Sequence, residues 1–160
     1  MRKRAARDGY GDRPSLTPTP LVSGTLVIMD LDYMEDYIEK HGLDEYKPNR
    51  VTGLLSNLVD AFARKWRGII VYGLNWERGT EEAVIEIPLV EPSEVKYDLE
   101  EIRNEVKREG GSITIVAVRE HLIARPARTR REAYSSYRRR AARMLRKLKA
   151  RGGDTVYIEE

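Results

Sequence analysis

The sequence predicts an α+β fold built around one core. Short apolar runs typical of buried strands occur between longer segments whose apolar residues recur at helical spacing. Glycine and proline mark most of the boundaries between these segments. The resulting order is β-α-α-β-β-α-β-α-β, and 160 residues are enough for one domain with a sizeable core.

The first third of the chain contains one predicted strand and two predicted helices. The strand is expected at about Thr25–Met29. Tyr33–His41 predicts a short helix that ends at Gly42. A longer helix is expected between Pro48 and Gly68, because one face of that segment is apolar. This stripe consists of Leu54, Leu55, Leu58, Val59, Phe62 and Trp66.

The middle of the chain predicts a hairpin followed by a helix. Ile69–Tyr72 and Ala83–Leu89 have strand composition and are joined by turn residues. Asp98 and Glu101 have the spacing of a capping box, so we expect a helix to begin there. The same helix should end at Gly110.

The last part of the chain adds a strand at Ser112–Val118, a helix from about Arg131 to Ala150 and an edge strand at Thr155–Ile158. The central β-α-β-β-α-β order is that of the ferredoxin-like unit, an antiparallel sheet with helices packed on one face. The C-terminal helix and the edge strand would be additions to that unit. Residues 22–160 are therefore expected to form a single palm-like domain.

Charge is distributed unevenly along the chain. Lys and Arg outnumber Asp and Glu by 5 to 2 in residues 1–21, are outnumbered 12 to 20 in residues 22–124, and outnumber them again by 12 to 4 in residues 125–160. The first segment also contains three prolines and reads as a basic arm without a core. The basic C-terminal part indicates a nucleic-acid or phosphate partner, or contact with the acidic body.

Composition excludes several classes of protein. The chain has no cysteine, so disulfides and thiolate metal sites are ruled out. No apolar run is as long as a membrane span, and we expect a cytoplasmic protein without a membrane partner. Charged residues make up 34% of the chain, which favours a thermophilic source. His41 and His121 lack companions at metal or triad spacing.

Four acids are candidates for chemistry. Asp30 and Asp32 follow the first strand, and Glu81 and Glu82 precede the third. The ferredoxin-like order brings these two segments together, which is how palm-type sites hold metals for phosphoryl transfer. Because neighbouring strand residues alternate in direction, only one of the two glutamates can face the site, and Glu81 is favoured. The alternatives are a helix N-cap for the aspartates and solvated charges at a hairpin tip for the glutamates.

The motifs, taken in order, resemble GGDEF domains, the palms of diguanylate cyclases. Met29-Asp30-Leu31-Asp32-Tyr33 is similar to the D-x-D-x-F that opens the first helix of the family. Gly79-Thr80-Glu81-Glu82-Ala83 resembles the G-G-[DE]-E-F loop, and Lys149 followed by Gly152 resembles the closing lysine and glycine. GTP cyclohydrolase III and the palms of CRISPR-associated cyclic-oligonucleotide polymerases share this core. The sequence departs from the family at Thr80, Ala83 and Ile38.

The resemblance implies a Mg²⁺-dependent palm that binds a nucleoside triphosphate, as a nucleotide cyclase or as a hydrolase like GTP cyclohydrolase III. Asp30 and Glu81 would be catalytic metal ligands, with Asp32 or Glu82 in support and the Leu31 carbonyl as a further contact. Lys149 would contact phosphates, with Arg146 beside it.

Further candidates lie outside these motifs. Trp76, in a predicted turn, is a candidate base-stacking platform or a hairpin staple. The alternative function is a catalytically degenerate palm that acts as a nucleic-acid-binding or assembly module through its basic C-terminal helix. The contacts would then come from Arg138, Arg139, Arg140 and Arg143. A homodimer formed through the tyrosine-bearing helix is a third reading.

Overall fold

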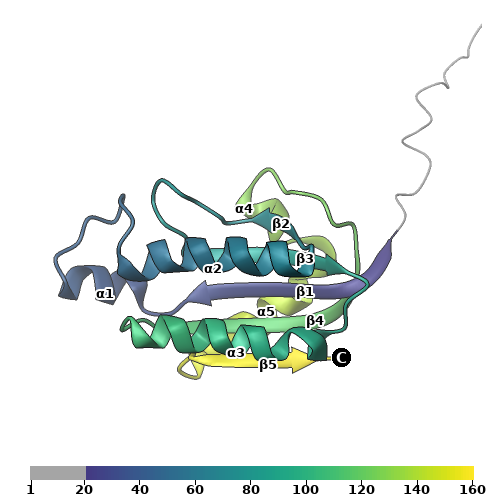
Figure 1. The fold of residues 1–160 in the computed structure, drawn as a ribbon. Coiled ribbons are helices and arrows are strands. Elements are labelled where there is room, and N and C mark those ends of the chain that lie inside the picture. Colours follow the sequence, from purple (N-terminus) through teal and green to yellow (C-terminus); the bar gives the residue numbers. More distant parts are fainter. Residues whose placement is uncertain (1–20) are drawn as a thin grey trace, which may run out of the picture.

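The computed structural model describes residues 21–160 and contains one five-stranded mixed sheet with helices on both faces (Figure 1). The predicted α+β class is confirmed. The N-terminal arm expected at residues 1–21 lies outside the described residues, apart from Leu21. The strands are β1 Val22–Leu31, β2 Ile69–Tyr72, β3 Glu82–Pro88, β4 Ile113–Leu122 and β5 Thr155–Glu159.

The sheet has the strand order β2-β3-β1-β4-β5, so β1 lies at its centre. β1 pairs antiparallel with both β3 and β4, and β2 pairs antiparallel with β3. β5, the expected edge strand, pairs parallel with β4, so the sheet as a whole is mixed, whereas β1–β4 pair antiparallel. A parallel neighbour requires a crossover connection, and residues 123–154 supply one that contains a helix.

Two long helices cover one face of the sheet, as predicted: α2 Arg50–Trp66 and α3 Pro92–Arg108 (Figure 1). The short helix α1, Met34–Lys40, precedes them. Asn49 caps α2, since its side-chain oxygen accepts hydrogen bonds from the backbone N–H groups of residues 51 and 52. The core beneath α2 and α3 includes Val27, Met29, Leu55, Val59, Leu99, Ile102 and Ile115.

The opposite face is covered by the C-terminal elements, so the helices do not all pack on one side. These elements are α4 Arg130–Ala133, the 3₁₀ turn η3 Ser136–Arg138 and α5 Arg139–Ala150. The second core, between them and the sheet, includes Leu26, Ile28, Val84, Val116, Val118, Ala141, Ala142 and Leu145. The strand residues of the two cores alternate along β1, as expected for a strand buried on both faces.

Two helix boundaries differ from the prediction. α3 begins at Pro92, because the Glu91 backbone N–H donates to the Glu94 carboxylate at 2.9 Å and proline suits the first helical position. The single helix expected from Arg131 is interrupted around Ser136, which has a φ of +60°. There the 3₁₀ turn directs Tyr137 and Arg138 at the buried carboxylate of Glu86, as described below.

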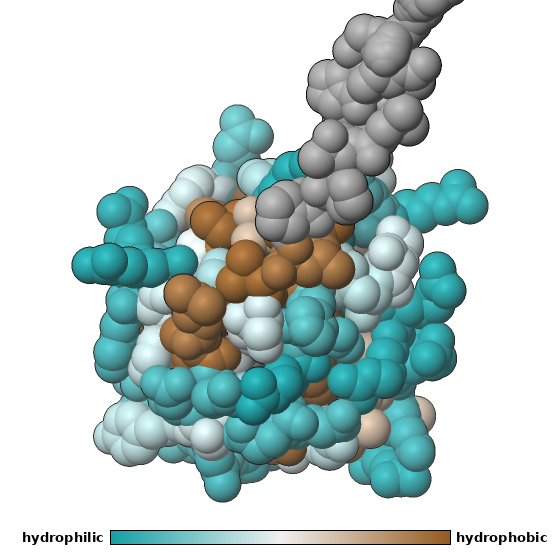
Figure 2. Space-filling model, turned by 90° about the vertical axis from the view of Figure 1, so that its right-hand side faces the viewer, coloured by the Kyte–Doolittle hydropathy of each residue, from teal (hydrophilic) through white to brown (hydrophobic). Residues whose placement is uncertain are grey.

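Apolar side chains gather at the end of the molecule where β1 begins (Figure 2). Leu21 and Leu89 are exposed there, and the Leu89 N–H donates to the Ser23 carbonyl at 2.9 Å. Among the described residues, no helix has the length and apolar character needed to cross a membrane.

Candidate active site

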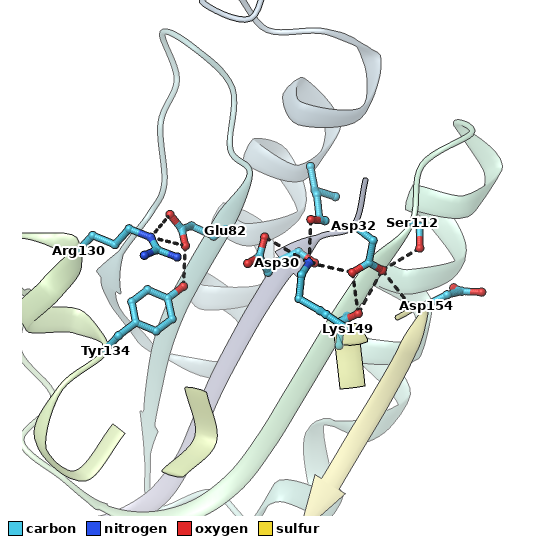
Figure 3. Close-up of polar contacts among 10 residues, drawn as sticks. Asp30, Asp32, Glu82, Ser112, Arg130, Tyr134, Lys149 and Asp154 are labelled. Atoms are coloured by element: carbon cyan, nitrogen blue, oxygen red, sulfur yellow. Dashed lines mark hydrogen bonds and ion pairs between the residues drawn. The ribbon is translucent and has the colours of Figure 1, made fainter. Parts of the chain in front are cut away.

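Two of the predicted acids face each other across neighbouring strands. Asp30, at the end of β1, pairs in register with Glu82 at the start of β3 and with Thr114 of β4. Alternate residues of the same strands, Ile28 and Val84, belong to the core under α5, so the three side chains lie on the α5 face. The sheet topology therefore brings Asp30 together with Glu82, rather than with the favoured Glu81 (Figure 3).

The Asp32 carboxylate accepts hydrogen bonds from several separate parts of the chain. Its side chain is only 3% exposed. Its carboxylate accepts hydrogen bonds from Ser112 Oγ at 2.8 Å, Thr114 Oγ1 at 2.8 Å, Lys149 Nζ at 2.8 Å and the Asp154 N–H at 2.9 Å. With its oxygens fully used, Asp32 connects the end of β1 to β4, to α5 and to the turn before β5.

The ammonium group of Lys149 lies among oxygens at the end of β1. Besides Asp32, it donates to the Leu31 carbonyl at 2.9 Å and to the Asp30 carbonyl at 3.4 Å. It lies 3.6 Å from Asp30 Oδ1. Lys149, expected to contact phosphates, therefore lies among four oxygen atoms that belong to residues 30–32.

The pKa of the Asp30 carboxyl group is raised above its ordinary value. Burial raises the pKa of its carboxyl group to about 6; the nearby Lys149 charge opposes this rise and the Glu82 charge adds to it. Carboxylates whose pKa values are raised by burial and by a like-charged neighbour are concentrated at functional sites. Asp30 thus carries an energetic cost in its ionised form that a cation at this position would relieve.

Glu82 has its own partners, which come from α4 and the residue after it (Figure 3). Arg130 Nε donates to both Glu82 oxygens, at 3.0 and 2.9 Å, and the Tyr134 hydroxyl donates to Oε1 at 2.7 Å. Burial and the Glu82 charge raise the pKa of Tyr134, so its hydroxyl stays protonated as a donor. No sequence motif links Glu82 to Arg130 or Tyr134.

Glu81 lies beside the same strand end through its backbone: its carbonyl accepts a hydrogen bond from the Leu31 N–H at 2.9 Å. The Glu81 side chain is exposed and has no ion pair within residues 21–160. It borders a cleft of about 300 Å³ between β2 and the following loop. The lining is Tyr72, Gly73, Leu74, Asn75, Arg78, Gly79, Glu81 and Glu82.

The loop between β2 and β3, residues 73–81, is hydrogen-bonded to α2. Thr80, which stands at the second glycine of the resembled motif, is buried, and its hydroxyl lies 2.7 Å from Ser56 Oγ. It also accepts a hydrogen bond from the Asn75 N–H at 3.0 Å. Gly79 has a φ of +89°, and a Cβ there would lie 2.2 Å from Thr52 Oγ1. Trp76, within this loop, is 56% exposed.

The basic candidates of the C-terminal elements differ in their surroundings. Arg138 is buried against Glu86, at 2.6 Å, and Arg140 pairs with both Glu120 and Glu159. By contrast, Arg139, Arg143 and Arg146 are exposed and have no ion pair within the described part of the chain.

Residues 21–160 contain no group of three or more His, Cys, Asp or Glu side chains arranged to hold a metal. Instead, the carboxylates of Asp30 and Asp32 and the backbone carbonyls of residues 30 and 31 surround the Lys149 ammonium. No protein-family model and no curated protein matches this chain.

Proposed function

We propose that this protein is a Mg²⁺-dependent palm that binds a nucleoside triphosphate at the end of β1 and catalyses phosphoryl or nucleotidyl transfer, or hydrolysis of the nucleotide. The observation that carries the proposal is the pairing of Asp30 with Glu82 in register beside the oxygen-lined position of Lys149. The order β2-β3-β1-β4, with α2 and α3 on one face, supports a ferredoxin-like palm.

The residues at this position suit magnesium. Mg²⁺ prefers hard oxygen ligands and usually binds through one or two carboxylates together with substrate phosphates. The Asp30 carboxylate and the Leu31 carbonyl can both serve as oxygen ligands, and the Lys149 ammonium lies 3.6 Å from the first and 2.9 Å from the second. Glu82 and Glu81 are the candidates for a second carboxylate. Bound Mg²⁺ would neutralise charge on the phosphates.

The chain's own residues would hold the phosphates. Lys149 carries a point charge on a flexible stem, and its side chain is 27% exposed, so it can exchange its carboxylate partners for phosphate oxygens. Arg130 has a side chain that is 59% exposed and bonds Glu82 through Nε only, which leaves its two terminal nitrogens for a bidentate phosphate contact. Tyr134 would keep Glu82 oriented. The adjoining cleft of about 300 Å³ has the size of a small-ligand site.

The proposal is tested by nucleotide binding and turnover. The protein is titrated by calorimetry with ATP, GTP, CTP and UTP, each with Mg²⁺ and with EDTA, and products are separated by chromatography. We expect at least one nucleotide to bind only with Mg²⁺, and we expect Asp30→Asn to lose this Mg²⁺-dependent binding. Asp60→Asn is the matched control, because Asp60 pairs with Arg64 on α2, away from the strand end. Binding that is equal in EDTA, or unchanged in Asp30→Asn, would overturn the proposal.

A further inference from the structure

The outer face of α5 carries a stripe of cations, which we name the α5 stripe: Arg139, Arg143 and Arg146. All three side chains are exposed. At 100° per residue they fall within about 60° of one another, opposite the buried Ala141 and Leu145. They extend over about 10 Å of the helix axis, at a rise of 1.5 Å per residue.

The stripe differs from the surface of α2 in lacking counter-charges. On α2, every cation within the helix has an ion-pair partner: Arg50 with Glu109, Arg64 with Asp60 and Lys65 with Asp98. On α5, Arg140 and Lys149 are paired in the same way. The three stripe residues have no such partner within residues 21–160, although acidic residues are abundant in the body of the chain.

Helix stability does not explain this arrangement. α5 has no acidic residue in its first turn and no side-chain cap, and Arg139 and Arg140 begin it. The positive end of the helix dipole favours acids there, so basic residues at that end are unfavourable. Like charges at i,i+3 and i,i+4, as in Arg139, Arg143 and Arg146, repel each other. A ligand that brings negative charge would remove both costs.

We propose that the α5 stripe binds the phosphodiester backbone of a nucleic acid. Arginine is suited to phosphate because its planar guanidinium makes bidentate hydrogen bonds. A lipid surface is less suited, because the apolar side of α5 is buried against the sheet and the exposed large hydrophobic residues within 21–160 lie elsewhere. The proposal goes beyond the nucleotide site, where Lys149 of the same helix donates to the Leu31 carbonyl.

The experiment compares two variants with equal loss of charge. The stripe variant is Arg139→Gln, Arg143→Gln, Arg146→Gln. Its control neutralises three exposed cations on the opposite face of the sheet: Arg64→Gln, Lys96→Gln, Arg108→Gln. Binding of the full chain to a fluorescent DNA duplex and to a single-stranded RNA, both of mixed sequence, is measured by anisotropy over a range of salt concentrations. Circular dichroism melts verify that both variants fold.

We expect the wild type and the control to bind with affinity that falls steeply with salt. Three lost phosphate contacts should lower the slope of log affinity against log salt by about 2 to 3 in the stripe variant. Asp30→Asn should bind as the wild type does, which separates this result from that of the nucleotide site. Equal slopes in the stripe variant and the control would overturn the proposal. Stronger binding to phosphatidylserine vesicles than to either nucleic acid would also overturn it, in favour of a membrane surface.

Discussion

Replacing Asp30 with asparagine is expected to stabilise the folded protein at neutral pH and to lose this effect at acidic pH. Burial raises the pKa of Asp30 from 3.8 to about 6. The folded state therefore holds the proton more tightly than the unfolded state. The resulting contribution to stability is present below the unfolded pKa and is lost as the pH rises through the folded pKa, so the wild type becomes less stable between about pH 4 and about pH 6.

The size of the effect follows from the shift. At 1.36 kcal/mol per pKa unit, the rise from 3.8 to about 6 corresponds to about 3 kcal/mol of unfolding free energy. The side chain is 24% exposed, so solvent screening makes this value an upper limit. Asparagine does not ionise, so the free-energy gap between the variant and the wild type should widen by up to about 3 kcal/mol between about pH 4 and about pH 8.

Urea unfolding, followed by circular dichroism in buffers that contain EDTA, measures this gap. The comparison across pH cancels any constant effect of the amide on packing. Asp60→Asn, at the partly exposed end of an ion pair with Arg64, should show little change of the gap with pH. A gap for Asp30→Asn that stays constant over this range would refute the reasoning, because it would mean that the Asp30 carboxyl titrates alike in the folded and unfolded states.

Two further substitutions test neighbouring features. Lys149→Gln removes the ammonium that lies 2.9 Å from the Leu31 carbonyl and would compete with Mg²⁺ for this position. Calorimetry without nucleotide should therefore show Mg²⁺ binding about tenfold more tightly, which corresponds to about 1.4 kcal/mol of lost competition. Unchanged or weaker binding would contradict the idea that Mg²⁺ and the ammonium share one position. Arg138→Met leaves the fully buried Glu86 carboxylate without its charged partner and should lower the unfolding free energy by about 3–5 kcal/mol in urea melts. Adding Glu86→Gln should restore part of that loss, and a cost below about 1 kcal/mol for the single change would speak against the pair as a stabilising contact.

Most of the fold could be predicted because its signals are local. The apolar stripe of α2, the glycines after the helices and the apolar run of β1 each lie within one segment, and the corresponding elements occur where expected. The start of α3 was missed because two capping boxes compete, and the one at Glu91 gains from Pro92. The Glu91 side chain also pairs with Arg119 on β4, a contact between segments that no local pattern encodes.

The candidate site was less predictable, because its contacts join distant segments. Asp30 was singled out by its position after an apolar strand. The choice between Glu81 and Glu82, however, depends on the register of β3 against β1, which only the assembled sheet defines. Arg138 was a candidate nucleic-acid contact because of its place in a basic run, whereas it is buried in an ion pair with Glu86, a residue of a distant strand.

The four-donor environment of Asp32 has a consequence for how the protein is made. Two of its donors, Lys149 and the Asp154 N–H, lie 117 and 122 positions further along the chain. During synthesis, the central strand and the α2 and α3 layer can form before those positions leave the ribosome. Until then Asp32 lacks half of its donors and Asp30 lacks the Lys149 cation, so the polar contacts at the end of β1 are completed only after residue 154 has left the ribosome.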